Sequence, residues 1–91
     1  MFEWDEEKAA LNLTKHGVSF DEAKSAFEDS LFLTFPDPLH SEIEFRFLLI
    51  GSSNMGRLLI IAYARREEQI RIISARKGTP RERRKYEEET Y

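Results

Sequence analysis

The sequence of 91 residues predicts an α+β domain with two N-terminal helices, a four-stranded antiparallel meander sheet and a C-terminal helix. Three observations lead to this prediction. Helix-capping residues and apolar residues at helical spacing occupy the first 29 positions, short apolar segments fill positions 31–76, and another capping box follows them. The chain has no internal repeat and no linker, and its length suits one hydrophobic core. We therefore expect a single domain over residues 1–91.

The first predicted helix covers residues 5–16. Asp5 has the short polar side chain that N-caps favour, and Gly17 suits the position after the last turn, where left-handed backbone is common. His16 lies in the last turn, where a cation interacts favourably with the helix dipole. This placement explains His16 without a function, and a functional role stays open.

The second predicted helix covers residues 21–29. Ser19 and Glu22 have the spacing of a capping box, in which the serine hydroxyl caps the helix and the glutamate returns a hydrogen bond. Phe20 and Phe27 recur at helical spacing, so we expect them to pack against the rest of the domain.

Four predicted strands follow the helices. Short connections rich in turn residues separate them, and strands joined in this way pair with their neighbours in antiparallel fashion. Prolines at positions 36 and 38 are expected to end the first strand, because proline has no backbone N–H to donate. The four strands cover residues 31–35, 44–50, 57–65 and 69–76.

Alternation along these strands assigns side chains to two faces. In the second strand Glu44 and Arg46 share the more polar face, which makes them the firmest pair among the candidate site residues. In the fourth strand strict alternation separates two sets, which are Ile70, Ile72 and Ser74 on one side and Arg71, Ile73 and Ala75 on the other.

The C-terminal helix is predicted to run from Pro80 to about residue 89. Thr79 and Glu82 form its capping box, and proline is favoured at the first helical position. Tyr86 is the one large apolar side chain within residues 80–89, so the helix has almost no face to bury. We expect it to be weakly docked or held by a partner. For Tyr86 itself, a core anchor and a contact with nucleic acid are both open.

Charge is distributed unevenly along a chain of net charge −3. Residues 1–56 carry 4 basic and 11 acidic side chains, whereas residues 57–86 carry 10 basic and 3 acidic ones. A basic segment of this kind is typical of a surface that faces a polyanion, and a solvated surface of mixed charge is the alternative.

Several classes of protein and site are excluded by what the sequence lacks. There are no cysteines, which excludes disulfides and thiol nucleophiles. The longest apolar run has seven residues, far below the roughly 20 of a membrane helix, and the N-terminus has no signal-peptide pattern. We therefore expect a cytoplasmic protein without membrane contact. The two histidines are far apart, no glycine-rich phosphate loop is present, and we expect neither a metal site nor a cofactor.

The remaining candidates for chemistry are arginines on and beside the strands, namely Arg46, Arg57, Arg65, Arg71 and Arg76. A guanidinium binds phosphate through two hydrogen bonds and keeps its charge at ordinary pH, so it suits a reacting phosphate. The alternative for Arg46 and Arg71 is a cross-strand pair with Glu44, Glu42 or Glu68 on a solvated face.

Several short motifs follow one another along the chain from residue 2 to about residue 87. They are Phe2-Glu3-Trp4-Asp5, Asn12-x-x-Lys15-His16-Gly17-Val18-Ser19-Phe20-x-Glu22-Ala23, Asp37-Pro38-x-His40-Ser41-Glu42, Glu44-x-Arg46-Phe47, Ile50-Gly51-x-Ser53, Gly56-Arg57, Arg71-Ile72-Ile73-Ser74-Ala75-Arg76 and Arg81-Glu82-Arg83-Arg84-x-Tyr86-Glu87. In this order the motifs resemble those of the BrnT family of toxins.

This resemblance implies the toxin of a type II toxin–antitoxin pair, with a fold like that of the RelE-like ribonucleases. Such proteins cleave RNA without a metal and arrest translation. The implied partner is a BrnA-like antitoxin with a ribbon-helix-helix part, which neutralises the toxin and binds operator DNA together with it.

The resemblance also implies roles for individual residues in attack by an RNA 2′-hydroxyl on the neighbouring phosphate. Arg46 and Arg76 would contact the scissile phosphate, and Glu44 would act as the base or orient Arg46. Tyr86 or His40 would act near the leaving group, although a surface loop histidine is the alternative for His40. The full expected set is Glu44, Arg46, Arg57, Arg76 and Tyr86 as catalytic residues, with His40, Arg71, Lys77 and Arg83 as RNA-binding residues.

Two other function classes remain open at this point. One is a non-enzymatic module that binds nucleic acid or protein through the same arginines, with salt-dependent binding and no product. The other is a structural operon partner that folds only with its antitoxin.

Overall fold

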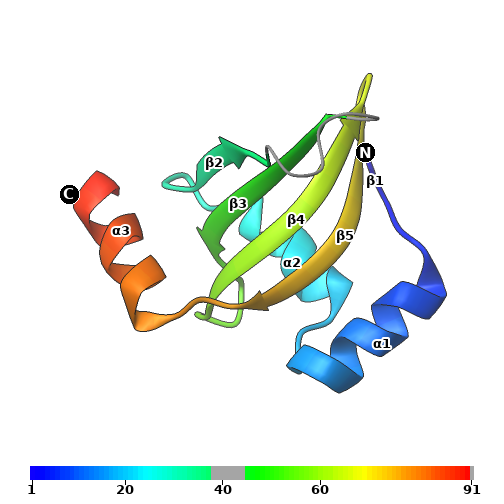
Figure 1. Ribbon diagram of the computed structural model, residues 1–91, viewed down its shortest axis with the longest axis horizontal. Coiled ribbons are helices and arrows are strands. Elements are labelled where there is room, and N and C mark those ends of the chain that lie inside the picture. Colours follow the sequence, from blue (N-terminus) through cyan, green and yellow to red (C-terminus); the bar gives the residue numbers. More distant parts are fainter. Residues whose placement is uncertain (38–44, 91) are drawn as a thin grey trace.

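A computed structural model describes residues 1–37 and 45–90 of the chain. Three helices and five strands are found within these residues (Figure 1). In chain order they are β1 (Phe2–Glu3), α1 (Glu6–His16), α2 (Phe20–Ala26), β2 (Leu33–Pro36), β3 (Arg46–Ser52), β4 (Leu58–Arg66), β5 (Gln69–Lys77) and α3 (Pro80–Thr90). None of these helices is long and apolar enough to cross a membrane.

The strands form one mixed sheet in the order β1-β5-β4-β3-β2. The antiparallel pairing of β2 through β5 confirms the α+β class and the predicted meander. The prediction of only four strands is wrong, because β1 adds a fifth strand that pairs in parallel with β5. Phe2 lies opposite Ile70 and Glu3 opposite Arg71. A strand of two residues is too short for alternation to reveal, and its pairing depends on a segment from the other half of the chain.

The two N-terminal helices begin at their predicted caps. The Asp5 carboxylate accepts hydrogen bonds from the backbone N–H groups of Glu7 and Lys8, and Gly17 ends α1 with a φ of 69°. The Ser19 hydroxyl accepts a hydrogen bond from the first turn of α2. Helix starts and ends of this kind are set by residues close in sequence, which is why they could be predicted.

Helix α2 ends at Ala26, earlier than the predicted residue 29. After it the backbone tightens, since the N–H of Glu28 donates to the carbonyl of Ser25 and the N–H of Asp29 to that of Ala26. The close approach of α2 to β3 occurs at Gly51, where a Cβ atom would lie 2.9 Å from the Ala26 oxygen. A side chain at position 51 would therefore push α2 off the sheet.

Proline 36 is the last residue of β2 rather than the residue that stops it. Pro36 pairs with Phe47 of β3, and β2 lies at the edge of the sheet. An edge strand has only one neighbour, so it tolerates a residue without a backbone N–H. Pro38 lies outside the described residues.

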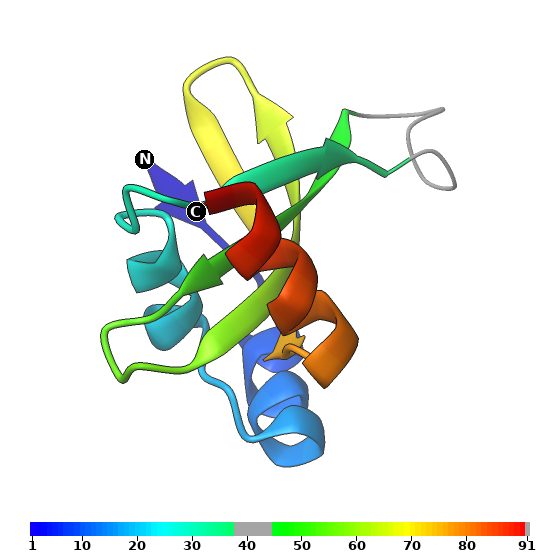
Figure 2. The ribbon, with the colours of Figure 1, turned by 90° about the vertical axis from the view of Figure 1, so that its left-hand side faces the viewer.

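The sheet separates two hydrophobic clusters. Helices α1 and α2 cover one side, which we call the helix face, and α3 lies against the opposite side, which we call the open face (Figures 1 and 2). Alternate residues of β4 divide between them. Leu59 and Ile61 belong to the larger cluster under α1 and α2, whereas Leu58 and Ile60 belong to the smaller cluster, against which Tyr86 of α3 packs.

A β-bulge in the β4–β5 pair changes the face of the residues that follow it. Tyr63 lies opposite Ile72, but the next pair is Ala62 with Ser74, so Ile73 is the extra residue. The predicted strict alternation along β5 is therefore wrong after Ile72. Ala75 is buried in the cluster on the helix face, and Ser74 lies with Ala62 on the open face.

Helix α3 forms as predicted and is docked mainly through Tyr86. The Tyr86 ring packs against the cluster on the open face, and its hydroxyl donates to Asp29 Oδ2 at 2.6 Å. The ammonium of Lys85 lies 5.2 Å from the centre of the Phe35 ring. No residue of α3 is fully buried. The core-anchor role of Tyr86 thus has direct support from its contacts.

Candidate functional site

Two predicted site arginines lie in one row across the open face. Arg46 of β3 and Arg71 of β5 are both directly opposite Ala64 of β4. Residues paired in this way point to the same face of a sheet. Neighbouring strands are about 4.8 Å apart, so the two arginine backbones lie about 10 Å apart with a methyl group between them.

Small side chains continue the surface beside this row. Ala62 and Ser74 pair in the next row, and Arg76 is opposite Ile60 in the row after that. Alanine and serine have short side chains, so the partly exposed Ala62 and Ser74 form a low strip on the open face, next to the fully buried Ala64. This strip lies between the row of Arg46 and Arg71 and the row of Arg76.

Arg76 is held by the first turn of α3. Its two terminal nitrogens donate to the two carboxylate oxygens of Glu82, each at 2.8 Å. The Thr79 backbone N–H also donates to this carboxylate, and the Thr79 hydroxyl accepts from the Glu82 N–H, so the predicted capping box forms. Hydrogen bonding to Arg76 is the main cause that lowers the pKa of Glu82 from 4.5 to about 2. The carboxylate thus occupies the two-donor fork that a phosphate would take.

Arg71 contacts an acid from the strand that was not predicted. Its Nη1 lies 3.3 Å from Glu3 Oε2 on β1. Both side chains are more than a third exposed, so water screens this ion pair and a competing anion can displace it. This contact matches the cross-strand alternative for Arg71, with a different acid from those considered.

Of the predicted pair Glu44 and Arg46, only Arg46 lies within the described residues. Arg46 begins β3 and is partly buried, whereas Glu44 lies outside the described residues. His40 and Glu42 lie outside them as well. The placement of Arg46 on the open face therefore comes from its pairing with Ala64 alone.

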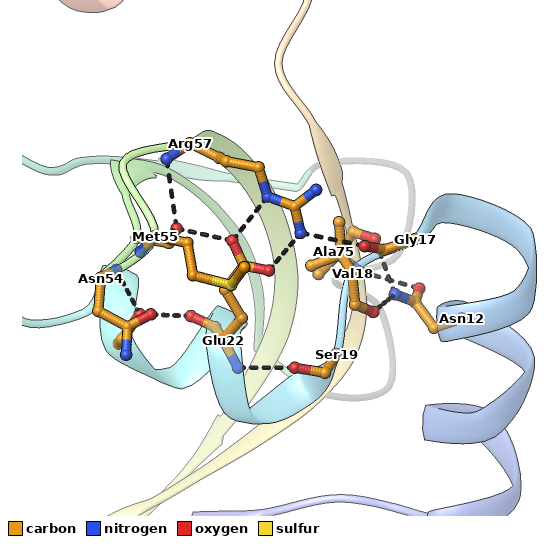
Figure 3. A network of polar contacts seen from close by, with 11 residues as sticks. Asn12, Gly17, Val18, Ser19, Glu22, Asn54, Met55, Arg57 and Ala75 are labelled. Atoms are coloured by element: carbon orange, nitrogen blue, oxygen red, sulfur yellow. Dashed lines mark hydrogen bonds and ion pairs between the residues drawn. The ribbon is translucent and has the colours of Figure 1, made fainter.

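Arg57 forms an internal ion pair on the other side of the molecule (Figure 3). Its Nε donates to Glu22 Oε2 at 2.9 Å, and its Nη2 donates to Glu22 Oε1 and to the Gly17 carbonyl. The Ser53 hydroxyl donates to the same carboxylate at 2.7 Å. These bonds, with that from Arg57 the strongest, lower the pKa of Glu22. They tie the β3–β4 hairpin to the start of α2, which favours a structural role for Arg57.

The tertiary hydrogen bonds of two buried polar residues in this region were not predicted from the sequence. Asn12 of α1 donates from Nδ2 to the carbonyls of Val18 and Ala75, and its Oδ1 accepts from the Ala75 N–H (Figure 3). Glu22 was assigned to a capping box, yet its carboxylate bonds to Arg57 and Ser53 instead. Only the motif resemblance, which includes Asn12 and Glu22, could have drawn attention to them.

The other predicted site residues are dispersed. Lys77 is opposite Leu59, which faces the core under α1 and α2, so it points away from Arg76. Arg83 is exposed on α3. The Tyr86 hydroxyl is bonded to Asp29, and this bond helps to lower the pKa of that carboxyl group against the effect of burial. The structure thus brings together Arg46, Arg71 and Arg76 from the predicted set.

No group of three or more His, Cys, Asp or Glu side chains that could hold a metal ion occurs within residues 1–37 and 45–90. The arginines of the open face can supply positive charge themselves. A guanidinium stays protonated at any physiological pH, donates in two directions at once and stabilises charge on phosphate oxygens. The open face is therefore chemically suited to binding a phosphodiester backbone.

Comparison with known proteins identifies the family. The family model described as "Ribonuclease toxin, BrnT, of type II toxin-antitoxin system" matches residues 4–82. Among solved structures, the 1.1 Å crystal structure of the Brucella abortus ribonuclease toxin BrnT matches with a TM-score of 0.68 and 29% sequence identity, covering 87% of this chain and 97% of that one. A search of the curated proteins found no match. Since the family model spans far more than half of its length, the chain belongs to the BrnT family of ribonuclease toxins of type II toxin–antitoxin systems.

Proposed function

We propose that this chain is a metal-independent endoribonuclease whose open face binds the RNA backbone. The observation that carries this proposal is the row Arg46–Ala64–Arg71, with Arg76 on the same face. Three permanent positive charges around a low strip suit the phosphates of a single strand, and binding of this kind needs no base-specific contact.

The proposed reaction is attack by an RNA 2′-hydroxyl on its own 3′ phosphate. The 2′ oxygen bonds to phosphorus and loses its proton, the bond to the 5′ oxygen breaks, and that oxygen takes up a proton. The products are a 2′,3′-cyclic phosphate and a 5′-hydroxyl. Arg46 and Arg76 would stabilise the extra charge on the phosphate oxygens, and Arg71 would hold an adjacent phosphate.

Proton transfer is assigned to residues outside the described segments. Glu44 is the proposed base, or the residue that orients Arg46, and His40 is the proposed donor to the leaving oxygen. Tyr86 is the other candidate donor, but its bond to Asp29 supports the anchor role instead. Lys77 and Arg83 would add only peripheral phosphate contacts, and Arg57 would act through the fold.

Substrate binding has to displace the internal acids. Glu82 and Glu3 already contact Arg76 and Arg71, and a phosphodiester, which carries one negative charge as a carboxylate does, would have to take their place. Its negative charge increases during the reaction, which favours the phosphate over the carboxylates in the transition state. The Glu3 contact is long and screened, so it yields readily. The Glu82 contact has two short bonds and gives α3 a direct connection to the proposed site.

The partner of a type II toxin is an antitoxin. We propose that it is a BrnA-like protein with a ribbon-helix-helix part, and that the complex binds operator DNA through the antitoxin. The support for this proposal is family membership together with the motif resemblance.

The test is cleavage of total RNA by the purified chain in EDTA, with analysis of the product ends. We expect cyclic phosphates from the parent and a loss of about 100-fold or more in Arg46→Ala. Arg84→Ala, which removes an exposed arginine of α3, is the matched control and should cleave normally. If free RNA is not cut, the same comparison is made on translating ribosomes. RNA binding without product in both assays would contradict the proposal and favour a non-catalytic module.

A further inference from the structure

An aromatic pocket of about 210 Å³ opens on the helix face, beyond the end of α2. Its walls include the rings of Phe27, Phe32, Phe47 and Tyr63. Helix α2 stops at Ala26, so the strands continue past it without a helix above them. The pocket is therefore a part of the core face that residues 1–37 and 45–90 leave open.

The rings of the pocket are held in place by one another. The centre of the Tyr63 ring lies 5.0 Å from that of Phe27 in an edge contact and 5.6 Å from that of Phe47 in a stacked contact. An apolar cavity of about 150 Å³ takes a benzene ring, so this pocket has room for one phenylalanine or leucine side chain. A preformed pocket of this kind is typical of the centre of a protein interface.

Exposed aromatic side chains extend the apolar surface beyond the pocket. Phe32 is 41% exposed and Phe45 is 74% exposed. The Phe45 carbonyl accepts a hydrogen bond from the backbone N–H of Arg65, which lines the pocket, so Phe45 lies beside its rim. Large apolar side chains exposed next to an open apolar pocket mark a contact site for another protein.

Arg65 adds a positive charge at the same rim. Its side chain is exposed and forms no hydrogen bond or ion pair with any residue of the described segments. It lies close enough to Tyr63 to oppose the rise in the pKa of that hydroxyl that burial causes. An exposed cation that no acid of residues 1–37 and 45–90 pairs with, beside an apolar pocket, is complementary to a carboxylate on a partner.

A protein fits this surface better than RNA does. The pocket lies on the opposite side of the sheet from Ala64 and the arginine row. Arg65 and Arg66 are followed by Glu67 and Glu68, so this rim has no excess of positive charge to attract a polyanion. The apolar rings and the Arg65 guanidinium instead match a segment with an aromatic or leucine side chain beside an aspartate or glutamate.

We propose that this pocket binds a segment of the antitoxin that carries an aromatic or leucine side chain beside an acidic one. Part of the antitoxin would then bind the toxin on the side of the sheet opposite the RNA-binding face. This inference rests on the toxin–antitoxin role of the chain. It implies that substitutions at the pocket weaken antitoxin binding and leave RNA cleavage intact.

The test uses the full chain and the protein encoded by the neighbouring gene of its operon, with affinity measured by calorimetry. Arg65→Glu reverses the rim charge, and Thr34→Trp fills the pocket from an exposed position of β2. We expect each to weaken binding at least about tenfold, the scale of a central interface contact. Arg84→Glu makes the same charge change on α3 and should bind as the parent does. Exchange of the partner's carboxylate for lysine should restore binding to Arg65→Glu.

The outcomes separate this inference from the proposed function. Parental affinity in both Arg65→Glu and Thr34→Trp, or no binding by the parent chain, overturns the pocket assignment whatever the RNA assay shows. A dimer of the lone chain that Arg65→Glu dissociates overturns it in favour of a second copy as the occupant. RNA cleavage is measured on the same variants without antitoxin, on free RNA and on translating ribosomes. Its absence in the parent in both assays contradicts the proposed function without altering the binding comparison.

Discussion

Asn12 is the buried polar side chain on which we expect the fold to depend most. It is only 7% exposed and connects α1 with the following loop and with β5. Its Nδ2 donates to the carbonyls of Val18 at 2.9 Å and Ala75 at 2.8 Å, and its Oδ1 accepts from the Ala75 N–H at 3.1 Å. Asn12→Ala removes all three hydrogen bonds and leaves the backbone groups of Ala75 buried without these partners.

We expect Asn12→Ala to lower the free energy of unfolding by about 3–4 kcal/mol. Three hydrogen bonds at about 1 kcal/mol each account for most of this loss, and burial of the abandoned Ala75 groups adds about 1 kcal/mol. Domains of this size are stable by roughly 5–15 kcal/mol, so the variant stays folded with a Tm lowered by roughly 20 °C.

Urea unfolding followed by circular dichroism measures this loss. Leu11→Ala on the same helix is the control, because Leu11 is 69% exposed and its removal should change stability by less than about 0.5 kcal/mol. A loss below about 1 kcal/mol in Asn12→Ala would refute the reasoning, since it would mean that water or relaxation replaces the three bonds.

Asn12→Asp separates the donor role of the amide from its acceptor role. The carboxylate keeps an acceptor for the Ala75 N–H but sets a negative charge against two carbonyl oxygens. Its pKa in the folded state is therefore raised above the unfolded value of about 3.9. The loss of stability relative to the parent should grow as pH rises above that value and shrink below it. An equal loss at acidic and neutral pH would contradict this account.

Four further predictions concern the open face and α3. Glu82→Gln removes the charge that competes for Arg76, so we expect tighter RNA binding by fluorescence anisotropy, and unchanged affinity would show that phosphate does not use this fork. Because the pKa of Glu82 is lowered from 4.5 to about 2, its ionised form stabilises the fold above pH 4.5, and this stabilisation disappears as pH falls toward 2. The parent should therefore lose more stability over this interval than Glu82→Gln does, as acid titration would show. Arg71→Ala removes one phosphate contact. The slope of the logarithm of the RNA-binding constant against the logarithm of salt concentration should become shallower by about 0.7. An unchanged slope would place Arg71 outside the RNA interface. Tyr86→Phe removes the hydrogen bond to Asp29 and should lower the free energy of unfolding by about 1 kcal/mol, with faster amide hydrogen exchange in α3. Unchanged exchange would mean that the packing of the ring alone docks the helix.

The parts of the fold that local sequence encodes could be predicted closely. The helix caps Asp5, Ser19 and Thr79 act on backbone groups within three residues, and the structure has all three. The strand segments were also placed within a few residues, since apolar alternation and turn residues are local signals. The resemblance to BrnT toxins, built on short ordered motifs, is confirmed by the family match.

The parts that depend on distant residues could not be predicted in this way. Strand β1 needs β5 beside it, and the bulge at Ile73 appears only when β5 is laid against β4. The partner of Arg57 is Glu22, from a helix that precedes two strands, and no spacing rule connects them.

Local signals along the chain are enough to predict the class of the fold, the starts of the helices, the basic second half of the chain and the family. Which arginines share a face, and which acid each contacts, follows from how the strands pair and pack. The physical reason is that a side chain's face depends on strand register, and one bulged residue reverses it for everything that follows. Arg71 and Arg76 are an odd and an even position of one strand, yet the bulge at Ile73 between them places both residues on the face that Arg46 shares.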